Sequence, residues 1–114
     1  MAHKDLTALR HILEAIDLIS QFTASGSRIL LEDRRTRDAV VFNLAVIGEA
    51  VKVLSEELRA SHPEIPWRKM AGMRDRLIHG YFAINDILVV EVVEKELPKL
   101  RCQIQDLLVE GSVD

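Results

Sequence analysis

Apolar residues recur along most of the chain at gaps of three and four, the spacing that places side chains on one face of an α-helix. The first such segment begins at Asp5, a good N-cap residue, and runs to about Thr23. Small residues at 24–27 then predict a turn, and residues 28–33 are expected to form a short helical piece before a charged run at 32–38. No segment alternates between apolar and polar residues, so the pattern predicts an all-α fold.

The segment 34–60 predicts a long helix that is apolar around most of its circumference. Its apolar residues are Val40, Val41, Phe42, Leu44, Ala45, Val46, Ile47, Ala50, Val51, Val53 and Leu54. A small helical monomer has few neighbouring helices with which to cover such a surface. We therefore expect a second subunit to cover part of it, which predicts a homodimer.

Two further helices follow. Residues 61–66 stop the preceding helix, and Pro66, near a first-turn position, starts another that is expected to continue to about Tyr81. The last helix begins near Asn85 or Asp86, and Pro98 predicts a kink in it or a break into two collinear helices. The expected architecture is a single domain over 1–114, an antiparallel bundle of four long helices plus a short one.

The composition is that of one ordinary globular domain, and the net charge limits which ligands the protein as a whole attracts. The 114 residues are 48% hydrophobic and 29% charged, with a net charge of −3. This charge argues against a globally basic nucleic-acid binder, so any phosphate chemistry must be local. The single cysteine, Cys102, and a start without an apolar signal segment indicate a cytoplasmic location, and no apolar run is long enough to span a membrane.

The candidate chemistry lies in the expected helix over 67–81. On a helical wheel, Arg74 falls in the middle of the apolar face, where its permanent charge demands a carboxylate, carbonyl oxygens or a bound anion. Glu49, at the edge of the preceding apolar helix, is a candidate partner. Asp75 and His79 are four residues apart, and Tyr81 lies two turns after Arg74, so four polar groups are expected to converge on one side.

Spacing alone favours a structural explanation, in which Arg74, Asp75 and His79 form a buried network. Other chemical sites have weaker support. Asp75 and His79 offer a metal only two ligands, and the chain contains no glycine-rich phosphate loop, so no metal and no cofactor are expected. Cys102 has no base beside it in sequence, which argues against a catalytic thiol.

Three segments carry a resemblance to a known family. Residues 67–82, WRKMAGMRDRLIHGYF, resemble the R-x-x-x-x-H-x-Y signature of the HepT-like branch of the HEPN superfamily. Residues 43–50, NLAVIGEA, and 63–67, PEIPW, resemble other segments of that family, and the similarity covers nearly the whole chain. The resemblance implies an all-helical homodimer whose two motifs meet across the interface. It also implies a metal-independent ribonuclease toxin of a type VII toxin-antitoxin pair.

The family motif assigns roles by position. Arg74 and His79 match its catalytic pair, and Tyr81 matches the tyrosine onto which a cognate antitoxin, a minimal nucleotidyltransferase, transfers AMP. Asp75 stands where asparagine is frequent in relatives, and an acid there favours a protonated His79, which suits a general acid and leaves the direction of proton transfer open. Metal-free RNA cleavage also needs cations along the substrate, and Arg68, Lys69 and Arg76 are expected to hold flanking phosphates.

Two readings from other classes compete with a ribonuclease. One is a non-catalytic helical subunit that binds nucleotide or RNA and acts with a nucleotidyltransferase. The other is a purely structural dimer. The intact R-x-x-x-x-H-x-Y motif favours the ribonuclease, because a scaffold has little need for an arginine on an apolar helix face.

Overall fold

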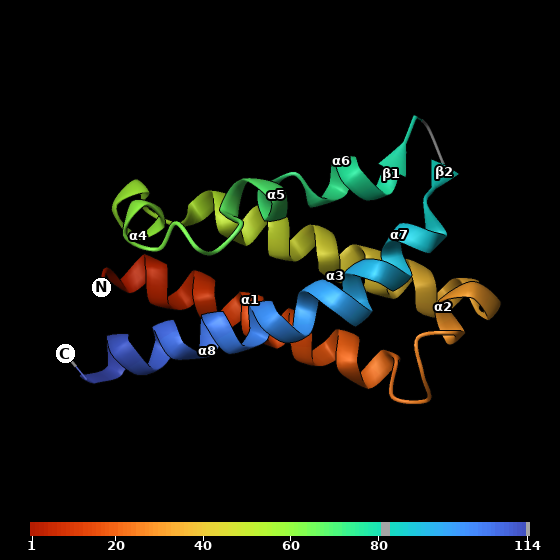
Figure 1. Cartoon of the computed structure of the whole chain (residues 1–114), viewed down its shortest axis with the longest axis horizontal. Coiled ribbons are helices and arrows are strands. Elements are labelled where there is room, and N and C mark those ends of the chain that lie inside the picture. The colour runs from red at the N-terminus through yellow and green to blue at the C-terminus, as the bar shows by residue number, and fades with distance from the viewer. Residues whose placement is uncertain (81–82, 114) are drawn as a thin grey trace.

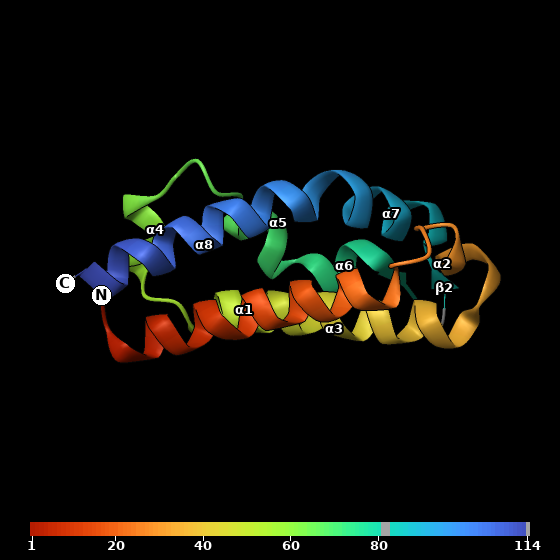
Figure 2. The same cartoon turned by 90° about the horizontal axis from the view of Figure 1, so that it is seen from below.

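Two long helices pack side by side along the molecule. In a computed structural model, which describes residues 1–80 and 83–113, α1 (His3–Phe22) and α3 (Arg34–Val53) are joined by a turn and the short helix α2 (Ile29–Glu32) (Figure 1). The arm that contains α8 lies along α1, and the segment with α5 and α6 lies against α3 (Figure 2). The all-α fold predicted from the sequence is confirmed.

Asp5 does not cap α1, which was the role expected from its position. Ala2 is the N-cap residue, and Asp5 lies within the first turn with only 2% of its surface exposed. Its carboxylate accepts hydrogen bonds from the backbone N–H and the Oγ–H of Ser55, at 2.8 and 2.7 Å. A buried carboxylate near a helix N-terminus is stabilised by the helix dipole and by these donors, so Asp5 fastens α1 to a distant turn.

That turn divides the helix expected over 34–60. Leu54 is extended (φ −60°, ψ 143°), and Ser55 then caps a separate helix, α4 (Glu56–Ser61), by accepting a hydrogen bond from the N–H of Leu58 at 3.1 Å. The single helix was therefore a wrong prediction. Apolar periodicity continues across Leu54, whereas the break depends on Ser55 and on its long-range bonds to Asp5.

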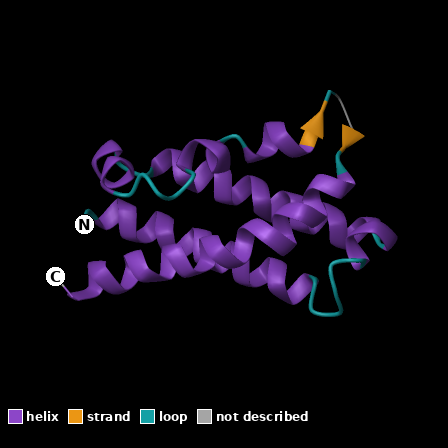
Figure 3. Cartoon of the chain, in the orientation of Figure 1, coloured by secondary structure: helices purple, strands orange, loops and turns teal. Residues whose placement is uncertain are grey.

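The helix expected over 67–81 is also wrong. The chain forms two short helices, α5 (Trp67–Ala71) and α6 (Met73–Leu77), and then a strand. The strand β1 (Ile78–His79) pairs antiparallel with β2 (Ala83–Ile84), although no strand was expected (Figure 3). Gly80 follows β1 with φ 63°, in the left-handed region that favours glycine. Tyr81 and Phe82 lie outside the described residues.

The last arm runs through Pro98 without a break. It consists of α7 (Asp86–Glu91), a π-helical segment η1 (Val92–Glu96) and α8 (Leu97–Val113), and both Val92 and Leu97 have right-handed helical dihedral angles. Pro98 has no N–H and crowds the preceding turn. A π-helical segment stands directly before it, and the chain stays helical through Pro98, so the expected break does not occur.

The core lies between these arms. Gly48 of α3 faces the backbone of α5 so closely that a Cβ there would stand 2.8 Å from the carbonyl oxygen of Met70. Glycine therefore allows the two segments to approach. Completely buried residues come from every long arm and include Leu9, Ile12, Leu44, Ile47, Leu77, Val89, Val92 and Ile104. Across the described residues, no helix is both long and apolar enough to cross a membrane.

Candidate functional site

Arg74 points outward from α6 instead of lying on a buried apolar face. Met73 and Leu77 of the same helix are buried, whereas Arg74 and Asp75 are exposed. The break at Gly72 separates α6 from the helix that carries Trp67 and Met70, so the helical wheel drawn through all of 67–81 assigned Arg74 to the wrong surface. The side chain of Arg74 makes no hydrogen bond or ion pair with any described residue.

The partner expected for Arg74 is engaged elsewhere. Glu49 is exposed on α3, and its carboxylate lies 3.5 Å from the Nζ atom of Lys52. The Arg74 guanidinium therefore has all its donors available for a ligand, as far as the described part of the chain is concerned. A guanidinium binds a phosphate or carboxylate with two parallel hydrogen bonds.

His79 lies on the β-hairpin that follows α6. It is exposed at the end of β1, opposite Ala83 of β2. Asp75 and His79 were expected to be neighbours because they are four residues apart on one helix. The backbone is already extended at Ile78 (φ −115°, ψ 120°), so this helical relationship is lost, and within the described residues no hydrogen bond joins the two side chains. The hairpin projects from the bundle beside α7 (Figure 1).

Arg76 anchors α6 to the last arm. Its Nη1 and Nη2 atoms donate to the two carboxylate oxygens of Glu96 at 3.1 and 2.9 Å, and the Nζ atom of Lys69 lies 3.5 Å from the same carboxylate. The hydrogen bonds from Arg76 are the main reason that the pKa of Glu96 lies below its ordinary value of 4.5. Of the three cations expected at flanking phosphates, Arg68 alone is exposed and outside any ion pair among the described residues.

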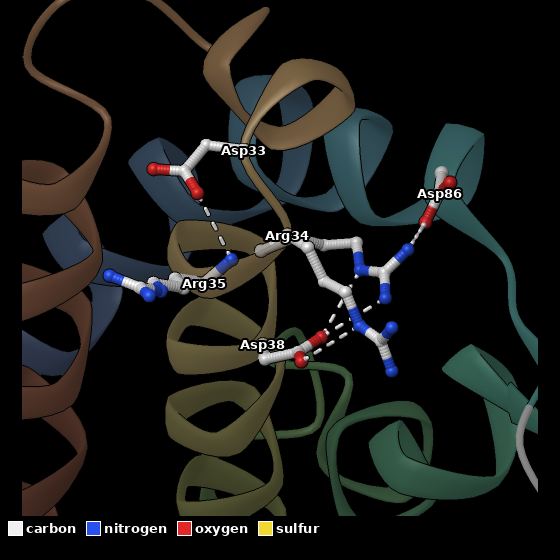
Figure 4. Close-up of polar contacts among 6 residues, drawn as sticks. Asp33, Arg34, Arg35, Asp38 and Asp86 are labelled. Atoms are coloured by element: carbon white, nitrogen blue, oxygen red, sulfur yellow. Dashed lines mark hydrogen bonds and ion pairs between the residues drawn. The ribbon is translucent and has the colours of Figure 1, made fainter.

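A second arginine holds the other end of the hairpin, and sequence reasoning missed it. Arg37 of α3 donates to Asp86 at 3.0 Å and to its neighbour Asp38 at 3.1 and 3.2 Å. Asp86 begins α7, two residues after β2 ends, and Figure 4 shows Asp38 and Asp86 on separate elements (Figure 4). Burial alone would lower the pKa of Arg37, but the two carboxylates raise it above its ordinary value.

The charged run at 32–38 contains Arg37 and includes the start of the helix expected from residue 34. The helix does begin there, because the side chain of Asp33 accepts a hydrogen bond from the N–H of Arg35 at 3.1 Å and so caps α3. The contact of Arg37 with Asp86 joins residues 49 positions apart. No local spacing signals such a contact.

The arrangement brings two kinds of chemistry to consecutive elements at one end of the molecule. Arg74 offers an anion a guanidinium that no described residue pairs with, and His79 offers an imidazole, the side chain that donates or accepts protons near neutral pH. Both side chains are exposed. The ion pair of Arg76 with Glu96 holds the helix that carries Arg74, and the ion pair of Arg37 with Asp86 holds the chain just after the hairpin that carries His79. Among the described residues, no three His, Cys, Asp or Glu side chains come together as a metal would require.

The helix α3 has an apolar surface that its own chain does not cover. Phe42 and Val53 are 68% and 53% exposed. Together with Val46, Ala50 and His11 they line a hollow of about 350 Å³ on the outside of the bundle. The expectation that this helix carries more apolar surface than one chain can bury therefore agrees with the exposure of these side chains.

Known proteins are similar in sequence to this chain along most of its length. The family model described as "Ribonuclease HepT-like" matches residues 12–107. The chain is 41% identical over 107 residues to "Probable ribonuclease HepT" of Thermococcus cleftensis, covering 93% of this chain and 96% of that protein. It is 40% identical over 101 residues to "Putative RNase TTE0752" of Caldanaerobacter subterraneus subsp. tengcongensis, covering 88% and 90%. No solved structure matches the chain.

Proposed function

The chain belongs to the HepT-like ribonuclease family, and on that premise we propose that it is a metal-independent endoribonuclease that cuts RNA with Arg74 and His79. The observation that carries this proposal is the exposure of both side chains on consecutive elements, with the guanidinium of Arg74 unpaired among the described residues. A structural arginine of this fold, such as Arg76, is instead bound to a carboxylate.

The proposed reaction is an internal transfer at one phosphate. The ribose 2′-oxygen forms a bond to the adjacent phosphorus, and the bond from phosphorus to the 5′-oxygen of the next nucleotide breaks. A base takes the 2′-hydroxyl proton, and an acid gives a proton to the leaving 5′-oxygen. The products carry a 2′,3′-cyclic phosphate and a 5′-hydroxyl.

The side chains divide these tasks. Arg74 stabilises the negative charge that gathers on the pentavalent phosphate, and His79 moves protons. Arg68 and Lys69 on α5 bind flanking phosphates, and Arg76 adds positive charge to that side while it holds Glu96.

A second copy of the chain supplies the second imidazole. In the proposed homodimer the two motifs face each other, and one His79 acts as base while the other acts as acid. The exposed apolar surface of α3, with Phe42 and Val53 at its ends, supports this dimer because water-exposed surface of that kind is stabilised by a second subunit.

The proposed biological role is that of a toxin of a type VII toxin-antitoxin pair. Its antitoxin is a minimal nucleotidyltransferase that transfers AMP to the phenolic oxygen of Tyr81. Support comes from the motif alone, because Tyr81 lies outside the described residues. The added phosphate would compete for Arg74, and the added base and ribose would block the path of the RNA.

RNA cleavage by purified protein tests the proposed reaction. We expect cleavage to persist in EDTA and to fall at least about a hundredfold in Arg74→Ala and in His79→Ala, the usual size of a charge-stabilising or acid-base contribution. Matched controls are Arg10→Ala and His3→Ala, whose side chains are exposed on α1. Equal cleavage by all four variants would identify a contaminating nuclease, and RNA binding without cleavage would favour the non-catalytic alternative.

A further inference from the structure

A groove with an apolar floor and a basic rim lies between α5 and the last helical arm. Its volume is about 260 Å³. Buried side chains of Met70, Met73, Leu97 and Leu100 form its floor. Its basic rim consists of the exposed lysines Lys69, Lys95 and Lys99.

The rim carries positive charge that the described residues do not balance. Lys69 shares the Glu96 carboxylate, but Arg76 already donates to both oxygens of that carboxylate. The other acid at the groove, Glu64, lies 3.2 Å from the ring of His62. Lys95 and Lys99 form no ion pair with any residue that the structure describes.

The positions of Lys95 and Lys99 make an anion favourable between them. They are four residues apart on one helical arm and line the same groove, and like charges at this spacing destabilise a helix unless a counter-charge is present. Lys95 stands in the π-helical segment and Lys99 in the α-helix that follows. An anion bound to both ammonium groups would relieve their repulsion.

The groove also lies next to the proposed catalytic residues. Met73 of its floor is followed directly by Arg74, and Glu96 of its wall is bound to Arg76 of the same short helix. The helix α6 spans five residues, which is about 7.5 Å. A strand held by Arg74 therefore needs only a few nucleotides to reach the groove.

We propose that this groove binds one nucleotide of single-stranded RNA beside the cleavage site, with the base on the methionine and leucine floor and its phosphate between Lys95 and Lys99. The inference rests on the proposed function for its ligand. The volume lies below the roughly 300 to 1,000 Å³ typical of pockets for drug-sized ligands, which suits a single nucleotide.

The floor also predicts what kind of base is bound. Methionine side chains are flexible and polarisable, so they adapt to flat rings of different shape. The four floor side chains carry no donor or acceptor for a base edge, whereas Gln103, which also lines the groove, carries an amide that has both. We therefore expect the floor to accept any base and contribute binding of the strand, with Gln103 as the candidate source of a base preference.

Lysine labelling in the unmodified protein tests the groove directly. The probe is a 2′-O-methyl RNA oligonucleotide, which binds as RNA does but lacks the hydroxyl needed for cleavage. We expect it to slow acetylation of Lys95 and Lys99 severalfold, as read by mass spectrometry, and to leave Lys4 on α1 unchanged. Equal labelling of Lys95 and Lys99 with and without the oligonucleotide would overturn the inference, as would protection by polyglutamate alone.

Variants separate this inference from the proposed function. In Lys95→Ala/Lys99→Ala we expect an unchanged kcat, a KM for RNA raised about tenfold, and a salt dependence of log KM that is flatter by about 0.7, the contribution of the one phosphate that the two lysines hold on a single strand. The control is Lys4→Ala/Lys52→Ala. An unchanged KM and salt dependence with active enzyme would refute the groove. Protected lysines in a protein that cleaves no RNA would refute only the proposed reaction.

Discussion

Arg76 donates one hydrogen bond to each carboxylate oxygen of Glu96, at 3.1 and 2.9 Å, and so ties the short helix α6 to the π-helical segment η1. The side chains are 21% and 30% exposed, so water only partly screens the pair. Arg74 and Arg76 stand on the same five-residue helix with different tasks. Arg76 is bound within the fold and positions the helix, and Arg74 is presented outward.

This pair predicts a pH-dependent contribution to stability. The pKa of Glu96 is lowered in the folded state, chiefly by the hydrogen bonds from Arg76, so the charged pair stabilises the fold above the ordinary glutamate pKa of 4.5 and loses its effect as the pH falls through the lowered value. At about pH 7 we expect Glu96→Gln to lower the free energy of unfolding by about 1 kcal/mol.

Urea unfolding of the parent and of Glu96→Gln across this pH range measures the effect. The difference between the two proteins should be largest above pH 4.5 and should shrink on acidification below it. A Glu91→Gln control, on the same arm, should follow the parent because this exposed glutamate forms no ion pair within the described residues. A difference that stays constant down to the lowest pH would contradict the assignment.

The contact between Arg37 and Asp86 predicts a positioning effect on the hairpin that carries His79. Asp86 begins α7 just after the hairpin, so loss of the contact should let β1 and β2 move relative to α6. We expect Arg37→Ala to lower kcat for RNA about 10- to 100-fold, the size of effect that small misplacements cause, with a smaller change in KM.

Conservative replacement distinguishes positioning from a purely structural role. Arg37→Lys keeps one charged donor toward Asp86 and should recover part of kcat, while Asp86→Asn should resemble Arg37→Ala. The control Arg34→Ala removes only an exposed ion pair to Asp38 and should leave kcat unchanged. A loss of activity that tracks unfolding in all variants would argue against positioning of His79.

The apolar surface of α3 predicts how the proposed dimer is broken. Phe42 is 68% exposed in the single chain, and an aspartate at this position would place a charge in the apolar contact between two copies. We expect Phe42→Asp to be monomeric at micromolar concentration by light scattering and to lose RNA cleavage, because one imidazole cannot serve as both acid and base.

A matched apolar residue outside this surface provides the control. Leu31 of α2 is 56% exposed, and Leu31→Asp should remain dimeric and active. A parent protein that is monomeric at the same concentration would remove the composite site, and so would full cleavage by a monomeric Phe42→Asp.

Coexpression with the nucleotidyltransferase tests the role of Tyr81. We expect the intact mass of the protein to rise by whole adenylyl units, a peptide with modified Tyr81, and loss of RNA cleavage. Tyr81→Phe lacks the phenolic oxygen, so it should escape modification and stay active in the presence of the partner. Full silencing of Tyr81→Phe would mean that the antitoxin acts by binding alone.

The spacing of apolar residues along the sequence was sufficient to determine which side chains of a single helix are buried, because that depends only on neighbouring turns of the helix. The apolar positions of α1, among them Leu9, Ile12 and Ile16, are buried as the periodicity predicts. The same holds for Leu100, Ile104 and Leu107 of the last arm. The order and spacing of Arg74, His79 and Tyr81 in the sequence also identified the ribonuclease family, because such a motif is recognised along the chain without knowledge of the fold.

The tertiary structure decided where helices stop and which charges stay free. The helix expected over 34–60 ends early where Ser55 donates a hydrogen bond to Asp5. The helix expected over 67–81 ends at the hairpin, where the N–H of Asn85 donates to the carbonyl oxygen of Leu77 at 2.8 Å. Periodicity continues through both places, so it cannot signal either break. Both Arg74 and Arg76 lie on α6, but only Arg76 is bound to Glu96. Arg76 faces the last helical arm, whose Glu96 is 20 residues away in sequence, and Arg74 does not.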